Sequence, residues 1–140
     1  MKISTRGRYA LRLMLELAMH EQEPRYISIK GIADHQHLSE KYLEQIVTRL
    51  GRGGMVFSAR GPAGGYRLAR PPEEFTIGEI LRLMEGDLSP VPEINPDLPP
   101  CAVEYVWKKL ATAINDVVDH ITLQDLVRLQ HEMDKDKKGR

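Results

Sequence analysis

The 140-residue chain contains a single cysteine, Cys101, and lacks any apolar run of membrane-spanning length. One cysteine excludes a disulfide within the chain and a metal site made only of cysteines from one chain. The N-terminus carries Lys2, Arg6 and Arg8 among its apolar residues, without a small-residue cleavage site after them, so we expect no secretion signal. These absences predict a cytoplasmic globular protein of one compact domain with an appended element.

Net charge is also lacking, because 20 basic and 20 acidic residues cancel. The cancellation conceals two unlike halves. Residues 1–72 hold 12 Lys and Arg against 6 Asp and Glu, whereas residues 73–140 hold 8 against 14. A basic half of this kind is typical of a region that binds a polyanion, although charges on solvated faces can also segregate without a partner.

The first predicted helix runs from about Thr5, its expected N-cap, to His20. Its apolar residues cover more than one face, so we expect burial on more than one side, by its own domain and by a second subunit. Basic side chains stand at its start, where free backbone N–H groups also favour a phosphate. These basic residues are Lys2, Arg6 and Arg8.

A helix-turn-helix motif is predicted next. Ser28 is placed to cap a short helix that ends near Gln36, and Ser39 to cap a second helix over residues 40–52. The second helix has one apolar face, while the remaining positions carry hydrogen-bonding side chains. This arrangement is typical of a motif whose second helix reads DNA. The outward polar residues of that helix are Lys41, Glu44, Gln45, Thr48 and Arg49.

A β-hairpin is predicted after this helix. Residues 55–59 and 66–68 have the composition of strands, and the turn between them contains Arg60 followed by glycines at 61, 64 and 65. A hairpin with a basic tip, placed after a recognition helix, is typical of a wing. The turn could also be read as a phosphate-cradling loop, but no Lys-Ser/Thr pair and no helix follow it.

The second half of the chain is predicted to be helical around a long loop. Thr76 and Glu79 match a capping box that begins a helix. Five prolines then fall between residues 86 and 100. An amphipathic helix from about Cys101 to His120 has the pattern of a dimerisation element, and Thr122 is placed to start a short last helix.

The predicted fold is therefore mainly α with a small β-hairpin wing. We expect a winged helix-turn-helix DNA-binding domain over residues 1–85 and a proline-rich regulatory loop over 86–100. A dimerisation helix and a short C-terminal helix would follow over 101–134, with a charged tail over 135–140.

Four short segments resemble one bacterial family, in matching order and spacing. They are residues 1–10 (MKISTRGRYA), 42–45 (YLEQ), 60–66 (RGPAGGY) and 121–126 (ITLQDL). The chain is similar over almost its whole length to the winged-helix regulators that include the iron–sulfur cluster regulator IscR and the cysteine-metabolism repressor CymR. The resemblance implies a homodimer that binds double-stranded operator DNA. An enzyme is not expected, because no nucleophile–base pair, paired carboxylates or cofactor loop stands out.

The resemblance also implies particular DNA contacts. By position, the family's base-reading residues fall on Lys41 and Glu44, and its wing arginine falls on Arg60. A glutamate can accept from a cytosine amino group, and an arginine suits a narrow minor groove, although the two helix residues could also be plain surface charges. The full predicted set is Lys2, Arg6, Arg8, Ser39, Lys41, Glu44, Gln45, Thr48, Arg49, Arg60, Gly61, Gly64 and Gly65.

Cluster-binding members of this family carry three cysteines and a histidine. Here Cys101 fits the third cysteine, whereas Ser89, Asn95 and Glu104 stand at the other places. One thiolate is a poor match for an iron–sulfur cluster, so we expect no cofactor, with Cys101 and Glu104 as the remaining metal candidates. Cys101 is also a candidate redox thiol at a helix start.

Two histidines near the helix turn form another metal candidate. They are His35 and His37, with Asp34 beside them. Because they lack the i, i+4 spacing that places two histidines on one helix face, surface or turn positions are the better interpretation.

The CymR branch of the family lacks the cysteine set and resembles this chain at residues 84–86 (MEG) and 89–91 (SPV). It implies a repressor of cysteine, sulfur or iron–sulfur metabolism genes that is controlled through a partner protein, a cysteine synthase. The alternatives are a redox-sensing or cluster-based regulator using Cys101, and a winged helix acting only through protein contacts.

Overall fold

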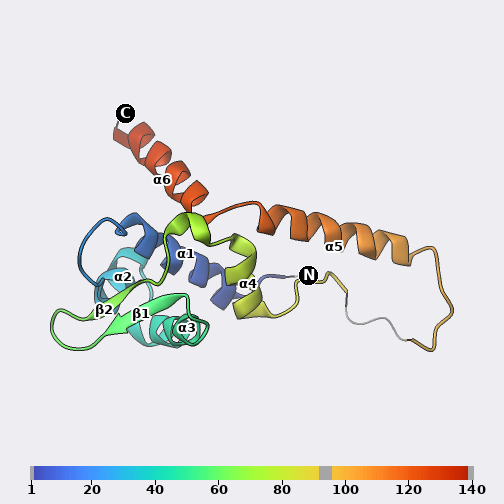
Figure 1. Ribbon diagram of the computed structural model, residues 1–140, viewed down its shortest axis with the longest axis horizontal. Helices are drawn as coiled ribbons and strands as arrows, with labels where there is room; N and C mark the ends of the chain where they lie inside the picture. Colours follow the sequence, from blue (N-terminus) through green and yellow to red (C-terminus); the bar gives the residue numbers. More distant parts are fainter. Residues whose placement is uncertain (1, 92–95, 139–140) are drawn as a thin grey trace.

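The computed structural model describes residues 2–91 and 96–138. The predicted place of Asn95, part of the proline-rich loop and the end of the tail lie outside these residues. Within the described chain, the structure consists of α-helices and one two-stranded hairpin that lies at the edge of the body, which confirms the predicted fold class (Figure 1). The elements are α1 (Thr5–Met19), α2 (Ile29–Gln36), α3 (Glu40–Arg52), β1 (Val56–Ala59), β2 (Gly65–Leu68), the 3-10 turn η1 (Pro72–Glu74), α4 (Ile77–Glu85), α5 (Glu104–Asp119) and α6 (Leu123–Lys138).

Helix α1 is the centre of the body. Ala10, Leu13 and Met14 are fully buried on it, and α3, α4, α6 and β2 all pack against it. Its N-cap is Ser4 rather than the predicted Thr5, because the Ser4 hydroxyl accepts the N–H of Gly7 at 3.1 Å. The several apolar faces of α1 are therefore covered largely by other helices of the same chain.

Phe75 joins the two halves of the sequence. Its ring is fully buried in the main core, in the same cluster as Leu123 from the start of α6. The backbone is paired there as well, since Leu123 N–H donates to the Phe75 carbonyl and Ile77 N–H to the Ile121 carbonyl, both at 2.9 Å. Residues near the C-terminus thus complete the core that supports the helix-turn-helix.

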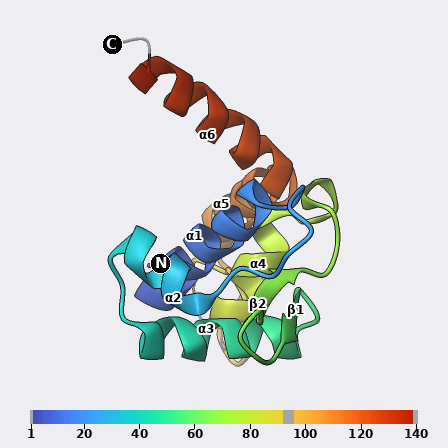
Figure 2. The same ribbon diagram turned by 90° about the vertical axis from the view of Figure 1, so that its left-hand side faces the viewer.

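Helix α6 is longer than the sequence predicted. Thr122 and Asp125 form the expected cap, with bonds of 2.9 and 3.1 Å between their side chains and backbone N–H groups. The helix then continues to Lys138, past the apolar stripe that suggested an early end. Its second half points away from the body, so solvent-facing residues with good helix propensity extend it without a core (Figures 1 and 2).

Helix α5 also extends away from the body, in a different direction (Figure 1). It begins at Glu104, three residues later than expected, and none of its residues is buried within the described chain. Tyr105, Val106, Leu110 and Val117 are exposed apolar residues on it. Only its last turns pack on the body, against α4.

Candidate DNA-binding surface

Helix α3 is held by one face and presents the other. The Ser39 hydroxyl accepts the N–H of Tyr42 at 3.1 Å, as an N-cap should. Leu43, Ile46, Val47 and Leu50 are buried in the core. On the opposite side, four of the predicted contacts line one shallow surface hollow and are exposed. These four are Lys41, Glu44, Gln45 and Thr48.

The hydrogen bonds and ion pairs of the side chains on this face determine which of their groups are available to a ligand. The Thr48 hydroxyl donates to the Glu44 carbonyl at 2.7 Å, which leaves its oxygen lone pairs and its methyl group for a ligand. No ion pair engages Lys41, Glu44 or Arg49 within the described chain, so their charges face solvent. A polar helix face with uncommitted charges fits the major groove, where base edges offer donors and acceptors.

Tyr42 and Tyr66 hold the elements of this surface in place. The Tyr42 ring meets the Tyr9 ring edge to face, with centroids 5.9 Å apart, and so ties the first turn of α3 to α1. Tyr66 pairs through its backbone with Ile27, at 2.8 and 2.9 Å. The pairing with Ile27 braces the hairpin from the loop after α1, and the sequence did not indicate it because an isolated bridge leaves no periodic pattern.

The hairpin projects next to α3 as a wing (Figures 1 and 2). Its register pairs Val56 with Leu68 and Ala59 with Gly65. β1 begins one residue later than predicted, because Met55 is buried and still donates to a carbonyl of the last turn of α3. Arg60 stands exposed at the start of the tip.

Each of the three predicted contact glycines has a structural reason to be glycine, either a positive φ or a close backbone neighbour. Gly65 has φ of +148°, and a Cβ there would overlap the backbone of Ile27. A Cβ at Gly64 would overlap the carbonyl of Ala59. Gly61 has φ of +97° with open space around it, so it is free to approach a ligand closely.

The start of α1 is anchored by a residue that sequence reasoning missed. The Ser4 backbone N–H and hydroxyl both donate to Glu85 Oε1, at 2.7 and 2.6 Å. Glu85 is 81 residues away at the end of α4, which is why no local motif reveals it. This carboxylate holds the segment that carries the exposed Lys2, Arg6 and Arg8.

The histidine candidates have structural roles. His35 Nδ1 lies 2.7 Å from Glu16 Oε1, and this contact links α2 to α1. His37 is the C-cap of α2, with φ of 57°. In the described part of the chain, no group of three or more His, Cys, Asp and Glu side chains is arranged to hold a metal ion.

The described residues at the family's cluster-ligand positions are Ser89, Cys101 and Glu104. Cys101 is exposed and stands three residues before Glu104, the first residue of α5. The Ser89 hydroxyl donates to the Val91 carbonyl at 2.9 Å, whereas iron–sulfur clusters are held by cysteine thiolates and in some centres by histidine. One thiol and one carboxylate do not fit a cysteine-ligated iron–sulfur cluster.

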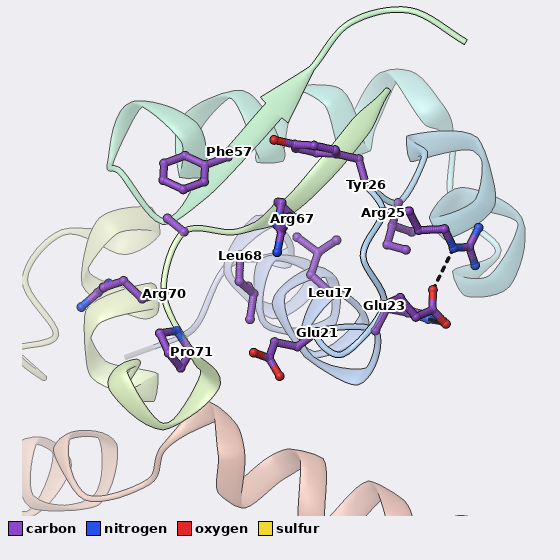
Figure 3. A pocket seen from close by; sticks show the side chains of 13 residues that line it. Leu17, Glu21, Glu23, Arg25, Tyr26, Phe57, Arg67, Leu68, Arg70 and Pro71 are labelled. Atoms are coloured by element: carbon purple, nitrogen blue, oxygen red, sulfur yellow. Dashed lines mark hydrogen bonds and ion pairs between the residues drawn. The ribbon is translucent and has the colours of Figure 1, made fainter. Parts of the chain in front are cut away.

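A cleft of about 310 Å³ lies behind the wing, between the loop after α1 and the chain that leaves β2 (Figure 3). Arg67 stands over the Tyr26 ring at 5.7 Å, and Arg25 pairs with Glu23 at 2.9 Å. The hydrogen bond with His20, and to a lesser extent Arg25, lowers the pKa of Glu23. The cleft contains no nucleophile–base pair, and its contacts brace the back of the wing.

Comparisons with known proteins identify this architecture. The model of the Rrf2 family, described as an iron-dependent transcriptional regulator, matches residues 3–129. The chain belongs to the Rrf2 family. The predicted family and the predicted absence of enzyme activity are thus confirmed, and this Rrf2 protein is a DNA-binding transcription regulator.

Individual Rrf2 relatives agree. The HTH-type transcriptional regulator CymR of Bacillus subtilis (strain 168) is 45% identical over 127 residues, covering 90% of this chain and 89% of that protein. The structure of CymR (YrzC), titled the global cysteine regulator of B. subtilis, matches with a TM-score of 0.83 at 44% identity, covering 92% of this chain and 98% of that one. The structure of T. potens IscR matches with a TM-score of 0.81 at 39% identity, covering 95% and 90%.

In these comparisons the chain is more similar to CymR than to IscR, which confirms the predicted closer likeness to the CymR branch. Among the described helices, none is both long and apolar enough to cross a membrane.

Proposed function

We propose that this protein is a homodimeric repressor that reads its operator with α3, the wing and the start of α1. The observation that carries the proposal is the exposed polar face of α3, whose charged side chains Lys41, Glu44 and Arg49 form no ion pair within the described residues. In this reading Glu44 accepts from a base amino group and Lys41 donates to guanine or to a phosphate. Arg60 enters the adjacent minor groove.

The remaining predicted contacts would position the protein on the phosphates. Ser39, at the N-terminus of α3, lies where backbone N–H groups favour an anion. Lys2, Arg6 and Arg8, together with Gln45, Thr48 and Arg49, would contact the backbone or neighbouring bases. Gly61, Gly64 and Gly65 would let the wing tip approach the DNA closely.

Dimerisation through α5 is part of the same proposal. Val106, Leu110 and Val117 recur at spacings of four and seven on one side of a helix that has no buried residue in the part of the chain that the structure describes. Exposed apolar rows of this kind mark contact surfaces. A second copy of α5 would cover them and place two recognition helices on two half-sites.

The likeness to CymR supports cysteine, sulfur or iron–sulfur metabolism genes as targets, without a cysteine-ligated cluster. The donor set around Cys101 supports a cofactor-free protein, and control through a cysteine synthase follows by analogy with that branch. The division into a reader over residues 1–85, a regulatory loop over 86–100 and a dimerisation part over 101–134 belongs to this proposal.

The central experiment is a gel shift with promoter DNA across a range of salt, beside sedimentation analysis of the free protein. A dimer whose operator affinity falls linearly on a log–log plot against salt supports the proposal, because phosphate contacts release counterions. A monomer without salt-dependent DNA binding contradicts it.

The signal needs separate measurements. Protein purified without oxygen should be colourless and free of iron and sulfide; a coloured, iron-containing sample would contradict the cofactor-free proposal. Pull-down of a cysteine synthase, with and without O-acetylserine, tests the partner. Failure of that pull-down under both conditions would leave the Cys101 thiol as the sensing alternative.

A further inference from the structure

A single arginine connects the body to α5. Arg82 on α4 donates from Nη1 to Asp119 Oδ1 at 2.6 Å and from Nη2 to Asp119 Oδ2 at 3.1 Å. Nη2 also donates to Asn115 Oδ1 at 2.8 Å, one turn earlier on α5. Such a two-pronged arginine–carboxylate contact fixes relative orientation, because both prongs must be satisfied in one plane.

Close packing around this contact restricts movement of α5 relative to α4. Ile77 and Leu81 pack against Ile114, Val118 and Ile121, directly beside the arginine. Gly78 lies one turn before Arg82, and a Cβ there would overlap the Asp119 and Arg82 side chains. The absent side chain is therefore what lets α5 approach α4 closely enough for the contact to form.

The contact of Arg82 with Asp119 and Asn115, called the joint below, lies near the C-terminal end of α5. Arg82 binds the last turns of α5. Just beyond them, the backbone hydrogen bond from Ile77 N–H to the Ile121 carbonyl holds the chain against the start of α4. The other turns of α5 run free of the body (Figure 1). A 16-residue helix is roughly 24 Å long, so a rotation of about 10° at the joint moves its far end by about 4 Å. That displacement exceeds the roughly 3.4 Å rise of one base pair.

We propose that Arg82 is a positioning residue that sets the angle between the DNA-reading body and α5, and thereby the spacing of half-sites that the dimer accepts. This inference rests on the proposed dimerisation through α5. Within the described chain, the hydrogen bonds and the ion pair of Arg82 involve Asp119 and Asn115 and none of the predicted DNA contacts. Because the pair is partly exposed, with side chains 37% and 41% accessible, its contribution to folding stability is small and its effect is on geometry.

The test uses the full-length Arg82→Met protein, which keeps an apolar stem and removes the donors. Its matched control is Arg128→Met, which removes an arginine paired with Asp125 within α6 and keeps the contact of Arg82 with Asp119 and Asn115. The probe is the duplex that wild-type protein selects from a random library, remade with half-site separations changed in single base-pair steps. Binding to a single half-site measures the DNA contacts of one reader, and sedimentation analysis measures dimerisation. The joint should change neither of them.

The expected result is a change in spacing selectivity alone. Arg82→Met should remain a dimer and bind the single half-site like wild type, but bind the selected spacing about tenfold more weakly and discriminate less among spacings. The exchange Arg82→Asp with Asp119→Arg should restore part of the selectivity, whereas Arg128→Met should match wild type throughout.

Two results would overturn the proposals in distinguishable ways. If Arg82→Met has the same spacing profile as wild type and Arg128→Met, the positioning role is wrong while the dimeric reader stands. If wild type is a monomer or selects no DNA, the proposed function fails and this inference fails with it. Should Arg82→Met not fold, Asn115→Ala and Gly78→Ala disturb the same joint and must alter the spacing profile.

Discussion

Ser39 offers a way to separate the stability of α3 from its contact with DNA. Its hydroxyl accepts the Tyr42 N–H at 3.1 Å and so satisfies one free donor at the helix start. Ser39→Ala should cost about 1 kcal/mol of folding free energy. For a domain of this size that is a fall in melting temperature of about 4 °C.

Ser39→Asp should behave differently. Aspartate caps a helix as well as serine does, so the melting temperature should stay close to wild type. If a DNA phosphate approaches this helix start, the new carboxylate repels it by about 1 kcal/mol at about 4 Å in water. Two copies in a dimer give about 2 kcal/mol, or a roughly 30-fold weaker operator complex.

The assays are thermal unfolding by circular dichroism and fluorescence anisotropy with labelled operator at one fixed salt concentration. The control is Thr76→Asp, the same charge at the N-cap of α4, which pairs with the start of α6 instead of facing DNA. Wild-type affinity for Ser39→Asp would refute the placement of a phosphate at α3. An equal loss of stability for the aspartate and alanine variants would refute the capping argument.

Three further predictions concern the wing, the anchor and acid stability. Arg60→Ala should weaken operator binding about tenfold with an unchanged melting temperature, and equal affinity in a gel shift at fixed salt would remove the wing from the mechanism. Glu85→Gln should lower stability by about 1–2 kcal/mol in urea titrations, because the charged acceptor for both Ser4 donors is lost; an unchanged urea midpoint would argue against this anchor. The backbone N–H of Thr122 lowers the pKa of Asp125, so its stabilisation is complete above the unfolded carboxyl pKa of about 3.9 and is lost as pH falls through the lower folded value. The urea midpoint of Asp125→Asn should therefore fall less between pH 5 and pH 3 than that of wild type, and parallel falls would contradict the assignment.

Sequence features within one or two helical turns predict much of the helix-turn-helix and wing. Ser28, Ser39 and Thr76 were each predicted as N-caps and each accept the expected backbone N–H, because a cap depends on residues within one turn. The spacing of apolar residues in α3 also separated its buried from its exposed face. The division of the chain into functional regions and the individual DNA contacts remain predictions.

The sequence predicts the wrong helix boundary where two residues can each serve as the cap, or where the apolar period ends before the helix does. Both Ser4 and Thr5 can cap α1, and only the geometry of the first turn, with Glu85 beside it, selects Ser4. The sequence predicts too early an end for α6, because the second half of this helix has no buried stripe and therefore no apolar period.

Neighbouring residues encode the order of helices and strands, the polar face of α3 and the family, because caps, periodicity and short motifs are local features of the sequence. Which distant residues hold these parts in place depends on the folded chain. Glu85 beneath Ser4, Ile27 beside Tyr66 and Arg82 against Asp119 join positions that are far apart in the chain. Such pairings depend on how the elements pack around Phe75 and α1, and no local sequence pattern specifies them.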